Sequence, residues 1–375
     1  MLTADYLDVL PGPIIALYQE YEEAVILDIV RRIARLGKIT SASAWQAQRL
    51  IDSGLVYESI LERLAELTGK SEKELAVMFR RAGVKAMRFD DSIYRAAGLS
   101  PLPLNLSPAM GEVLAAGLRK TGGIMRNLTM TTAISGQRAF EHAADLAYMQ
   151  ISSGAFDYNT AIRFAVRKVA EDGLTVVNYA NGRVDQLDVA MRRTVLTGVN
   201  QTVGILQERR ADEMGQDLVQ TSAHIGARNT GVGPANHEGW QGKIFSRSGT
   251  SKEYPDFVTE TGYGTVTGLY GVNCRHSHFP FFEGISQIAY NQATLDSFAN
   301  KTVAWRGNTI SVYDATQEQR SIERRIRHWK RQANAMEAAG MDASRELAKV
   351  KTWQARMRVF LKETGMDRQR VREQI

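Results

Sequence analysis

Apolar residues return every three or four positions along most of the first 220 residues, which predicts a series of amphipathic helices. Glycines are interpreted as helix ends, and Ser71 with Glu74 as a capping box that starts a new helix. Residues 99–106 contain two prolines and are expected to form a linker. The expected helical segments are 13–37, 40–54, 55–68, 71–83, a helix beginning at 108, 123–152, 159–171 and 184–214.

Residues 221–284 lose this helical pattern. The window holds 11 of the 31 glycines, four of the six histidines and Cys274, the one cysteine of the chain. Such a composition predicts tight turns and short strands, with strand fragments expected at 244–245 and 264–268.

Helical patterning returns after a predicted β-hairpin at 302–313, whose turn is expected at Gly307 and Asn308. Thr316 and Gln319 predict the start of the next helix. Apolar residues then follow heptad spacing in two runs separated by Gly340, which predicts two helices that pair as an antiparallel hairpin. The first run is Ile322, Ile326, Trp329, Ala333 and Met336, and the second is Ala343, Leu347, Val350, Gln354, Met357 and Leu361.

These patterns predict an α+β fold that is mainly α. A chain of 375 residues is long enough for two or three domains. The expected division is a helical body over 1–220, a glycine-rich module with short strands over 221–314, and a basic helical hairpin over 315–375.

Composition excludes several classes of protein. With 44% hydrophobic and 23% charged residues, the chain is too apolar to be wholly disordered. One cysteine excludes an internal disulfide and favours a reducing compartment. No apolar run approaches the ~18 residues of a membrane span, and acids stand where a signal peptide would carry Lys or Arg. We therefore expect a soluble intracellular product.

The net charge of +6 is concentrated in the last part of the chain. Residues 318–375 hold 15 basic and 8 acidic residues, and the remainder holds 32 and 33. A row of arginines predicted to face away from the apolar seam could contact nucleic-acid phosphates without recognising bases, although a solvated helix surface explains it equally well. The expected contact residues are Arg320, Arg324, Arg327, Arg331, Arg345, Lys349 and Arg356.

The histidines and the cysteine of the glycine-rich window are candidate ligands of a structural zinc ion. His224, His237, Cys274 and His276 would supply the thiolate and imidazole ligands that zinc prefers, with His278 as an alternative to His224. Against this, alternate residues of a strand point to opposite faces. A packed thiol with hydrogen-bonded histidines remains the alternative interpretation.

A nuclease that works without metal is a second hypothesis for the same window. His237 and His276 could exchange protons while Arg228 and Lys243 bind phosphate. The chain has no phosphate-binding loop, zinc-protease motif or hydrolase serine motif. We therefore expect no catalytic residues and keep the nuclease as the alternative.

The glycine-rich window carries a series of short motifs, among them HEGWQGK at 237–243 and GVNCRH at 271–276. Together they resemble the tailed-phage minor capsid protein 2 family. The resemblance extends to the helical first half at 68–72 (TGKSE) and to the C-terminal part at 313–324 and 354–358 (QARMR). The most specific positions are Trp240, Gln241, Lys243, Asn273, Arg275 and Pro280. The motifs of the glycine-rich window are 224–228 (HIGAR), 237–243 (HEGWQGK), 254–257 (YPDF), 261–264 (TGYG), 271–276 (GVNCRH) and 280–282 (PFF).

The resemblance implies a structural head protein of a tailed phage or prophage, similar in role to the Mu-F-type head-morphogenesis proteins. It implies a place inside the head near the portal vertex after synthesis in the bacterial cytoplasm. The implied partners are the portal protein, the major capsid protein and packaged double-stranded DNA, which the protein could accompany on ejection. The helical body would then dock to the portal or capsid. The family supplies no catalytic residues to carry over.

Overall fold

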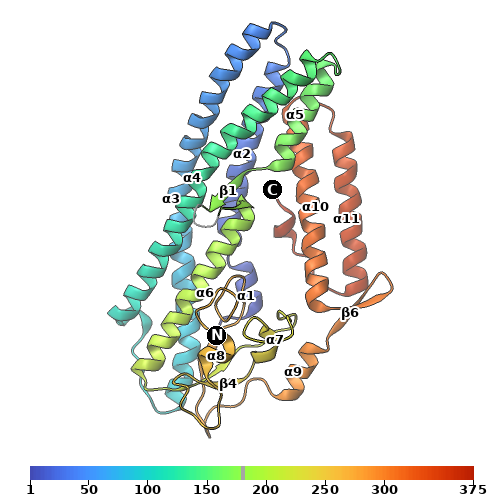
Figure 1. Cartoon of the computed structure of the whole chain (residues 1–375). Helices are drawn as coiled ribbons and strands as arrows, with labels where there is room; N and C mark the ends of the chain where they lie inside the picture. The colour runs from blue at the N-terminus through green and yellow to red at the C-terminus, as the bar shows by residue number, and fades with distance from the viewer. Residues whose placement is uncertain (179–181) are drawn as a thin grey trace. The chain divides into compact units, whose positions relative to one another are not determined.

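The computed structural model describes residues 1–178 and 182–375, and it consists of long α-helices with small antiparallel sheets (Figure 1). This confirms the predicted α+β class, mainly α. No helix in these two ranges has the length and apolar character of a membrane span. The helices are α1 (Ala4–Val9), α2 (Gly12–Leu36), α3 (Ala42–Ala96), α4 (Pro108–Ser152), α5 (Tyr158–Asp172), α6 (Leu187–Glu213), α7 (His237–Trp240), α8 (Phe257–Thr261), α9 (Gln292–Ala299), α10 (Val312–Ala338) and α11 (Ser344–Thr364), with 3-10 turns η1 (Leu104–Leu106) and η2 (Arg370–Glu373). The strands are β1 (Thr175–Asn178), β2 (Arg183–Gln186), β3 (Leu218–Thr221), β4 (Ile244–Ser246), β5 (His278–Pro280), β6 (Thr302–Trp305) and β7 (Asn308–Ser311).

The chain forms two compact units, each assembled from three separated segments. The expected linear division into 1–220, 221–314 and 315–375 stays a prediction. The two compact units are divided along the chain in another way, because each of them contains segments of the helical first half. Unit 1 comprises Met1–Pro13, Glu72–Ile124 and Arg192–Thr316, and unit 2 comprises Ile14–Ser71, Met125–Met191 and Gln317–Ile375.

Residues 42–96 form one continuous helix, α3, where the sequence predicted several short ones. The predicted ends at Gly54 and Gly69 were wrong, because an exposed glycine lowers helix stability by about 1 kcal/mol without supplying a stop. The predicted capping box was also wrong. The Ser71 hydroxyl donates to the carbonyl of Thr68 inside the helix.

Glycines end helices where the backbone turns left-handed. α3 ends just before Gly98, whose φ is 79°, and α11 ends before Gly365, whose φ is 67°. Residues 97–107 join α3 to α4 as the predicted linker. α4 then begins at Pro108 as expected, and the Ser107 side chain accepts a hydrogen bond from the N–H of Met110.

Unit 1 contains a three-stranded antiparallel sheet in the order β4–β3–β5. Val219 of β3 pairs with Phe245 of β4 on one side and with Pro280 of β5 on the other. This sheet and the apolar cluster beside it hold the glycine-rich segment together. The buried side chains of that cluster are Val219, Trp240, Phe245, Phe257, Leu269, Tyr270 and Cys274.

Two local predictions in unit 1 need correction. Residues 264–268 form turns instead of a strand, since Gly264 has a φ of 84°. The β6–β7 hairpin is present, but its turn lies one residue earlier than predicted, at Arg306 and Gly307. Both of these residues have positive φ, which gives the turn the twist that a two-residue hairpin favours.

The helix α10 begins at Val312, one turn before the predicted start at Thr316. The Ser311 side chain accepts a hydrogen bond from the N–H of Asp314 at 3.0 Å, which is the cap that starts the helix. Thr316 already lies inside the helix, where its hydroxyl donates to the Val312 carbonyl.

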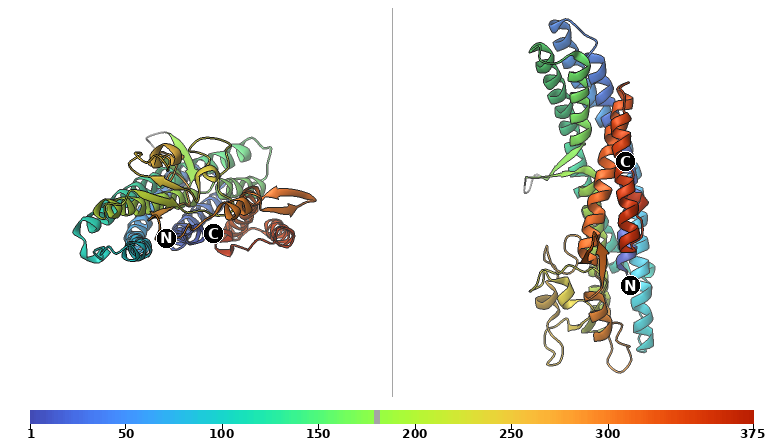
Figure 2. Two further views of the ribbon diagram at one scale, coloured as in Figure 1. Left: turned by 90° about the horizontal axis from the view of Figure 1, so that it is seen from below. Right: turned by 90° about the vertical axis from the view of Figure 1, so that its right-hand side faces the viewer.

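The helices α10 and α11 lie side by side in unit 2 (Figures 1 and 2). Arg356 pairs with Glu318 at 2.8 Å, and the Lys349 ammonium lies 6.0 Å from the ring centre of Trp329. From Lys349 to Arg356 along α11, the contacted residue on α10 moves back from Trp329 to Glu318, which requires antiparallel helices. The predicted helical hairpin is therefore confirmed.

The apolar seam of this hairpin is shifted on α11. Val350 and Met357 are buried as predicted, but Leu347 is 43% exposed. Glu346 takes the inward position because its carboxylate pairs with Arg167 of α5 at 2.6 Å. The buried row of α11 is therefore set partly by an ion pair with a helix far away in the sequence.

Candidate functional site

Three of the predicted metal ligands meet in unit 1. His237 begins the short helix α7, while Cys274 and His276 lie in the loop that leads into β5. One ligand atom of each residue lies within 4.8 Å of the other two, and each residue is at most 2% exposed. We call these three residues the His/Cys cluster.

The loop geometry brings Cys274 and His276 to the same side. The objection that alternate strand residues diverge does not apply, because this segment is loop and Asn273 has a φ of 59°. The Cys274 sulfur lies 3.8 Å from Nδ1 of His276 and accepts the backbone N–H of His276 at 3.4 Å. The backbone of Tyr270 also donates to this sulfur. Two backbone donors therefore point at one sulfur atom.

Both cluster histidines are fixed by hydrogen bonds on their outer nitrogens. His237 Nε2 lies 2.8 Å from the carbonyl oxygen of Thr267, and His276 Nε2 lies 3.1 Å from Oε1 of Gln241. Asn200 donates from Nδ2 to the carbonyl of His276 at 3.2 Å, which fixes the loop. Because these acceptors require a proton on Nε2, Nδ1 carries the lone pair in both rings.

Burial sets the protonation of the cluster. It lowers the pKa of His237 to about 4 and that of His276 well below its usual value, so both imidazoles are neutral at pH 7. It raises the pKa of the Cys274 thiol to about 11, although the backbone donors oppose this. Without a cation the cluster holds a neutral thiol beside two neutral imidazoles, and a metal ion would replace the thiol proton.

His224, the fourth predicted ligand, lies beside the cluster. Its ring stacks on His276 with 4.3 Å between the ring centres. Nδ1 lies 3.0 Å from the carbonyl oxygen of Ile225, while Nε2 is buried and has no hydrogen-bond partner among the described residues. Burial lowers the pKa of His224 to about 4, so this ring is also neutral.

His278 belongs to a different network, which the sequence analysis missed. Its Nε2 lies 3.0 Å from Glu208 and its Nδ1 lies 2.9 Å from the Tyr270 hydroxyl. Burial would raise the pKa of Glu208, but hydrogen bonds and charges from His278 and Arg247 lower it to about 2. His278 is therefore committed to this pairing, with both ring nitrogens in contact with partners outside the cluster.

Asp90 of α3 joins the same network. The side chain of Gln207 accepts from the Tyr270 hydroxyl at 2.8 Å and donates to Asp90 at 2.9 Å. Asp90 is fully buried, and burial raises the pKa of its carboxyl to about 7 despite the Gln207 hydrogen bond. The network holds α3, α6 and the β5 region together within unit 1.

The four residues of the nuclease hypothesis do not share one open site. His237 and His276 are buried, whereas Lys243 is exposed. The Arg228 guanidinium donates to the carbonyls of Thr267 and Val272, at 3.3 and 3.1 Å. A phosphate diester has no exposed histidine pair to approach here, so the geometry does not favour this alternative.

The predicted arginine row of α10 does not form one outward face. Arg324 is exposed, but the other three side chains are only 11–15% exposed and each is paired with a carboxylate. The partners are Glu323 for Arg320 at 3.0 Å, Asp188 for Arg327 at 3.2 Å and Glu22 for Arg331 at 3.3 Å.

The predicted basic residues of α11 have mixed environments. Arg345 and Lys349 are exposed, whereas Arg356 is partly buried and pairs with Glu318. Nucleic-acid binding by the C-terminal hairpin stays a prediction, now with fewer exposed cations to support it.

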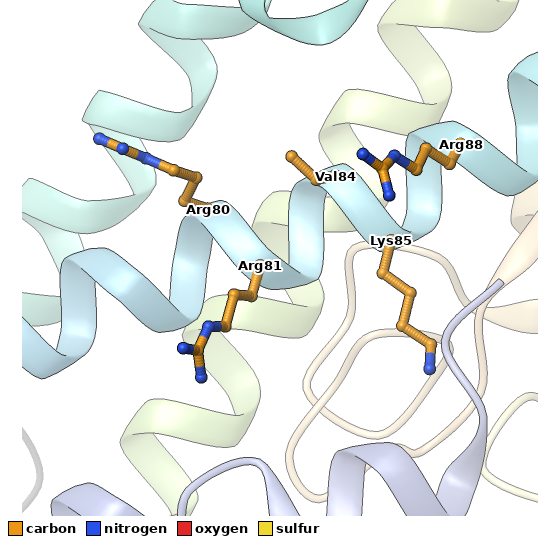
Figure 3. A pocket seen from close by; sticks show the side chains of 5 residues that line it. All are labelled: Arg80, Arg81, Val84, Lys85 and Arg88. Carbon is orange, nitrogen blue, oxygen red and sulfur yellow. The ribbon is translucent and has the colours of Figure 1, made fainter.

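A second row of cations, which was not predicted from the sequence, lies on α3 in unit 1. Figure 3 shows the side chains of Arg80, Arg81, Lys85 and Arg88 leaving the same stretch of the helix around Val84. All four are exposed, and no carboxylate of the described chain lies within ion-pair distance of them. We call these four residues the α3 row. The spacing of four and three residues from Arg81 to Arg88 was the signal in the sequence.

A profile of the phage minor capsid protein 2 family matches residues 2–362, which include the His/Cys cluster and most of both units. The chain belongs to this family. The resemblance seen in the sequence motifs is thus confirmed, and the protein is a phage minor capsid protein.

Relatives of this minor capsid protein are known in lactococcal phages. A structural protein of Lactococcus phage LL-H is 20% identical over 372 residues, which cover 94% of this chain and 95% of the relative. A structural protein of Lactococcus phage mv4 is 30% identical over 127 residues, which cover 33% of this chain and 93% of the relative. No solved structure matches the chain significantly.

Four of the six motif residues, Trp240, Gln241, Asn273 and Arg275, lie in or beside the His/Cys cluster. The Trp240 ring centre lies 4.7 Å from that of His237, and its Nε1 donates to the carbonyl of Pro234. Arg275 pairs with Asp8 of α1 at 3.1 Å. Gln241 and Asn273 shape the cluster as described above, Pro280 lies in β5, and Lys243 is exposed.

Proposed function

We propose that this minor capsid protein is a structural, non-enzymatic component of the phage head. It lies inside the head near the portal vertex, with the portal protein and the major capsid protein as partners, and it contacts packaged double-stranded DNA. Membership in the family and the structural proteins of two lactococcal phages support the place in the virion. The α3 row supports the contact with DNA and is the observation that carries this part of the proposal.

The α3 row has the chemistry of a contact with a DNA backbone. Four exposed cations without carboxylate partners attract polyanions, whereas paired cations do not. The seven residue steps from Arg81 to Arg88 span about 10 Å of helix axis. That length covers about three phosphate steps of ~3.4 Å along one DNA strand. Such contacts neutralise phosphates and release counterions without recognising bases.

The virion assignment is tested by quantitative mass spectrometry of purified DNA-filled particles. We expect peptides from 24–31 and from 315–375 at a few copies per portal, in particles treated with external protease. Particles that lack the protein while the lysate contains it would contradict the proposal. Cross-linking within intact heads then identifies the neighbours, and we expect links to portal subunits.

The DNA contact is tested by neutralising the α3 row with Arg80→Gln, Arg81→Gln, Lys85→Gln and Arg88→Gln. We expect sequence-independent binding in the wild type, with an affinity that falls steeply with salt. The variant should bind more weakly, with a smaller salt dependence, by about one unit of log–log slope per lost phosphate contact.

A variant of α11 with the same loss of charge is the matched control. Arg345→Gln, Lys349→Gln, Lys351→Gln and Arg358→Gln remove four exposed cations from the C-terminal hairpin. We expect this variant to retain most of the wild-type salt dependence. If it loses as much binding as the α3 variant, net charge governs the affinity and the assignment to the α3 row is wrong. If it alone loses binding, the hairpin is the contact surface. Incubation with RNA and DNA should give no cleavage.

A further inference from the structure

The geometry of the His/Cys cluster matches that of a tetrahedral metal site. Zinc bonds of about 2.3 Å to sulfur and 2.0–2.1 Å to nitrogen place tetrahedral ligand atoms roughly 3.6 Å apart. The Cys274 sulfur and His276 Nδ1 are 3.8 Å apart, and the ligand atom of His237 lies within 4.8 Å of both. Small side-chain adjustments suffice to bring these three atoms onto one ion.

The hydrogen bonds around the cluster are those of a metal site. Histidines that bind metal ions typically donate their second ring N–H to a carbonyl or carboxylate, which fixes the tautomer. His237 and His276 have such acceptors on Nε2, in Thr267 and Gln241. Cys274 receives two backbone donors, which a thiolate requires and a neutral thiol does not.

In His224 the roles of the two ring nitrogens are exchanged. Its Nδ1 faces the Ile225 carbonyl, which leaves Nε2 to act as the acceptor. That nitrogen is buried without a partner among the described residues, which is unfavourable unless another group satisfies it. The stacking of its ring on His276 places it beside the cluster. An ion held by the cluster would give this buried nitrogen a partner once the ring turns toward it.

We propose that His237, Cys274 and His276 bind a zinc ion and that His224 completes the tetrahedral set. The ion displaces the proton of the Cys274 thiol to solvent and binds the resulting thiolate, and the three imidazoles bind as neutral ligands. One thiolate with three imidazoles suits zinc better than magnesium or calcium, which prefer oxygen ligands. The site cross-links α7 to the loop before β5 and does not depend on the proposed contact with DNA.

Zinc content and cobalt substitution test the proposal on the wild-type chain. We expect purified, dialysed protein to hold one zinc ion per chain, measured by inductively coupled plasma mass spectrometry. Protein stripped by a chelator and loaded with Co²⁺ should show the intense visible bands of tetrahedral cobalt and a near-ultraviolet thiolate charge-transfer band. That band reports the sulfur ligand directly, so this part of the test needs no variant.

Variants then assign the ligands. Cys274→Ser should abolish the charge-transfer band, and His237→Gln should lower zinc affinity at least a hundredfold in competition with a chromophoric chelator. His224→Gln should retain the thiolate band but weaken binding at least tenfold. His142→Gln, which replaces an exposed histidine of α4, is the matched control and should bind zinc like the wild type.

Two outcomes would overturn the proposal. Folded wild-type protein that holds no zinc after exposure to excess Zn²⁺, and gives no cobalt bands, would show that the cluster is a hydrogen-bonded core. Zinc binding that survives in folded Cys274→Ser protein at wild-type affinity would place the ion elsewhere. Unchanged affinity in His224→Gln would remove His224 from the ligand set and assign the fourth position to water.

Discussion

Two rows of cations with the same helical spacing have opposite environments in this protein. On α10, Arg320, Arg327 and Arg331 are almost buried, and each is paired with a carboxylate. On α3, Arg81, Lys85 and Arg88 are exposed and have no such partner in the described chain. The spacing of charges on a helix therefore shows which side chains share a face. Their acidic partners, on the same helix for Arg320 and on α6 and α2 for Arg327 and Arg331, decide whether that face is available to a ligand.

The two rows of cations also differ in how much they contribute to the stability of the fold. A buried guanidinium that lost its carboxylate would carry an uncompensated charge, so the α10 row stabilises unit 2. An exposed cation gains little stability from its surroundings, so the α3 row can be changed without harm to the fold.

The largest effect is expected when the α10 row loses a partner. Glu22 is 4% exposed, pairs with Arg331 and accepts the backbone N–H of Leu174 at 2.9 Å. Glu22→Ala leaves both donors unsatisfied, and we expect a loss of about 3–5 kcal/mol in the free energy of unfolding. Urea denaturation measures the change.

Glu20→Ala is the control for that substitution, because Glu20 is exposed on the same helix, α2. It should change the free energy of unfolding by less than about 0.5 kcal/mol. Equal effects of Glu20→Ala and Glu22→Ala would mean that the α10 row is not held by its carboxylates.

An intermediate effect is expected at Asp90, which lies two residues after Arg88 but on the buried side of α3. Its pKa is about 7 in the fold and 3.8 in the unfolded chain. At a pH between these two values, the folded protein therefore keeps a proton on the Asp90 carboxyl that the unfolded chain has lost. Stability therefore falls as the pH rises from 4 to 7. Asp90→Asn should stabilise the protein more at pH 8 than at pH 5, by on the order of 2 kcal/mol.

Thermal melting at the two pH values checks this prediction. Asp314→Asn serves as the control, since Asp314 is exposed. A gain in melting temperature from Asp90→Asn that is the same at pH 5 and pH 8 would show that the Asp90 carboxyl does not titrate between them.

The smallest effect on stability is expected for the α3 row itself. Arg81→Gln with Lys85→Gln should change the free energy of unfolding by no more than about 0.5 kcal/mol, while DNA binding weakens. The ammonium of Lys85 lies 4.3 Å from the ring centre of Tyr6, so a small loss from that contact is included. A loss of several kcal/mol would show that this row is structural, like the one on α10.

The sequence predicted the helices and the residue types of the cluster better than their surroundings. The period of apolar residues was enough to predict α2, α5 and the hairpin of α10 and α11, whereas α4 is one helix where two segments were expected. Glycine was misleading at Gly54 and Gly69, where the helix continues, whereas at Gly98 and Gly365 a left-handed backbone accompanies the helix end. The distinction depends on backbone conformation, which the residue type does not determine.

Long-range partners account for the remaining differences. His237, Cys274 and His276 could be proposed as neighbours from their chemistry, but the turn at Asn273 that aligns two of them was not visible in the sequence. The exclusion of His278 depends on Glu208 of α6, and the burial of the α10 row depends on acids of α2 and α6. Spacing within one helix carries no information about such partners.

The interleaved construction of the two units has a consequence for synthesis on the ribosome. Ile14–Ser71 is made about 250 residues before Gln317–Ile375, which unit 2 also requires. Until then Glu22 of α2 lacks Arg331, and Glu23 lacks the Asn334 side chain that donates to it. Contacts between such distant segments form slowly and leave apolar surface exposed to aggregation in the meantime. The nascent chain is therefore expected to need protection by chaperones until α10 and α11 have been released.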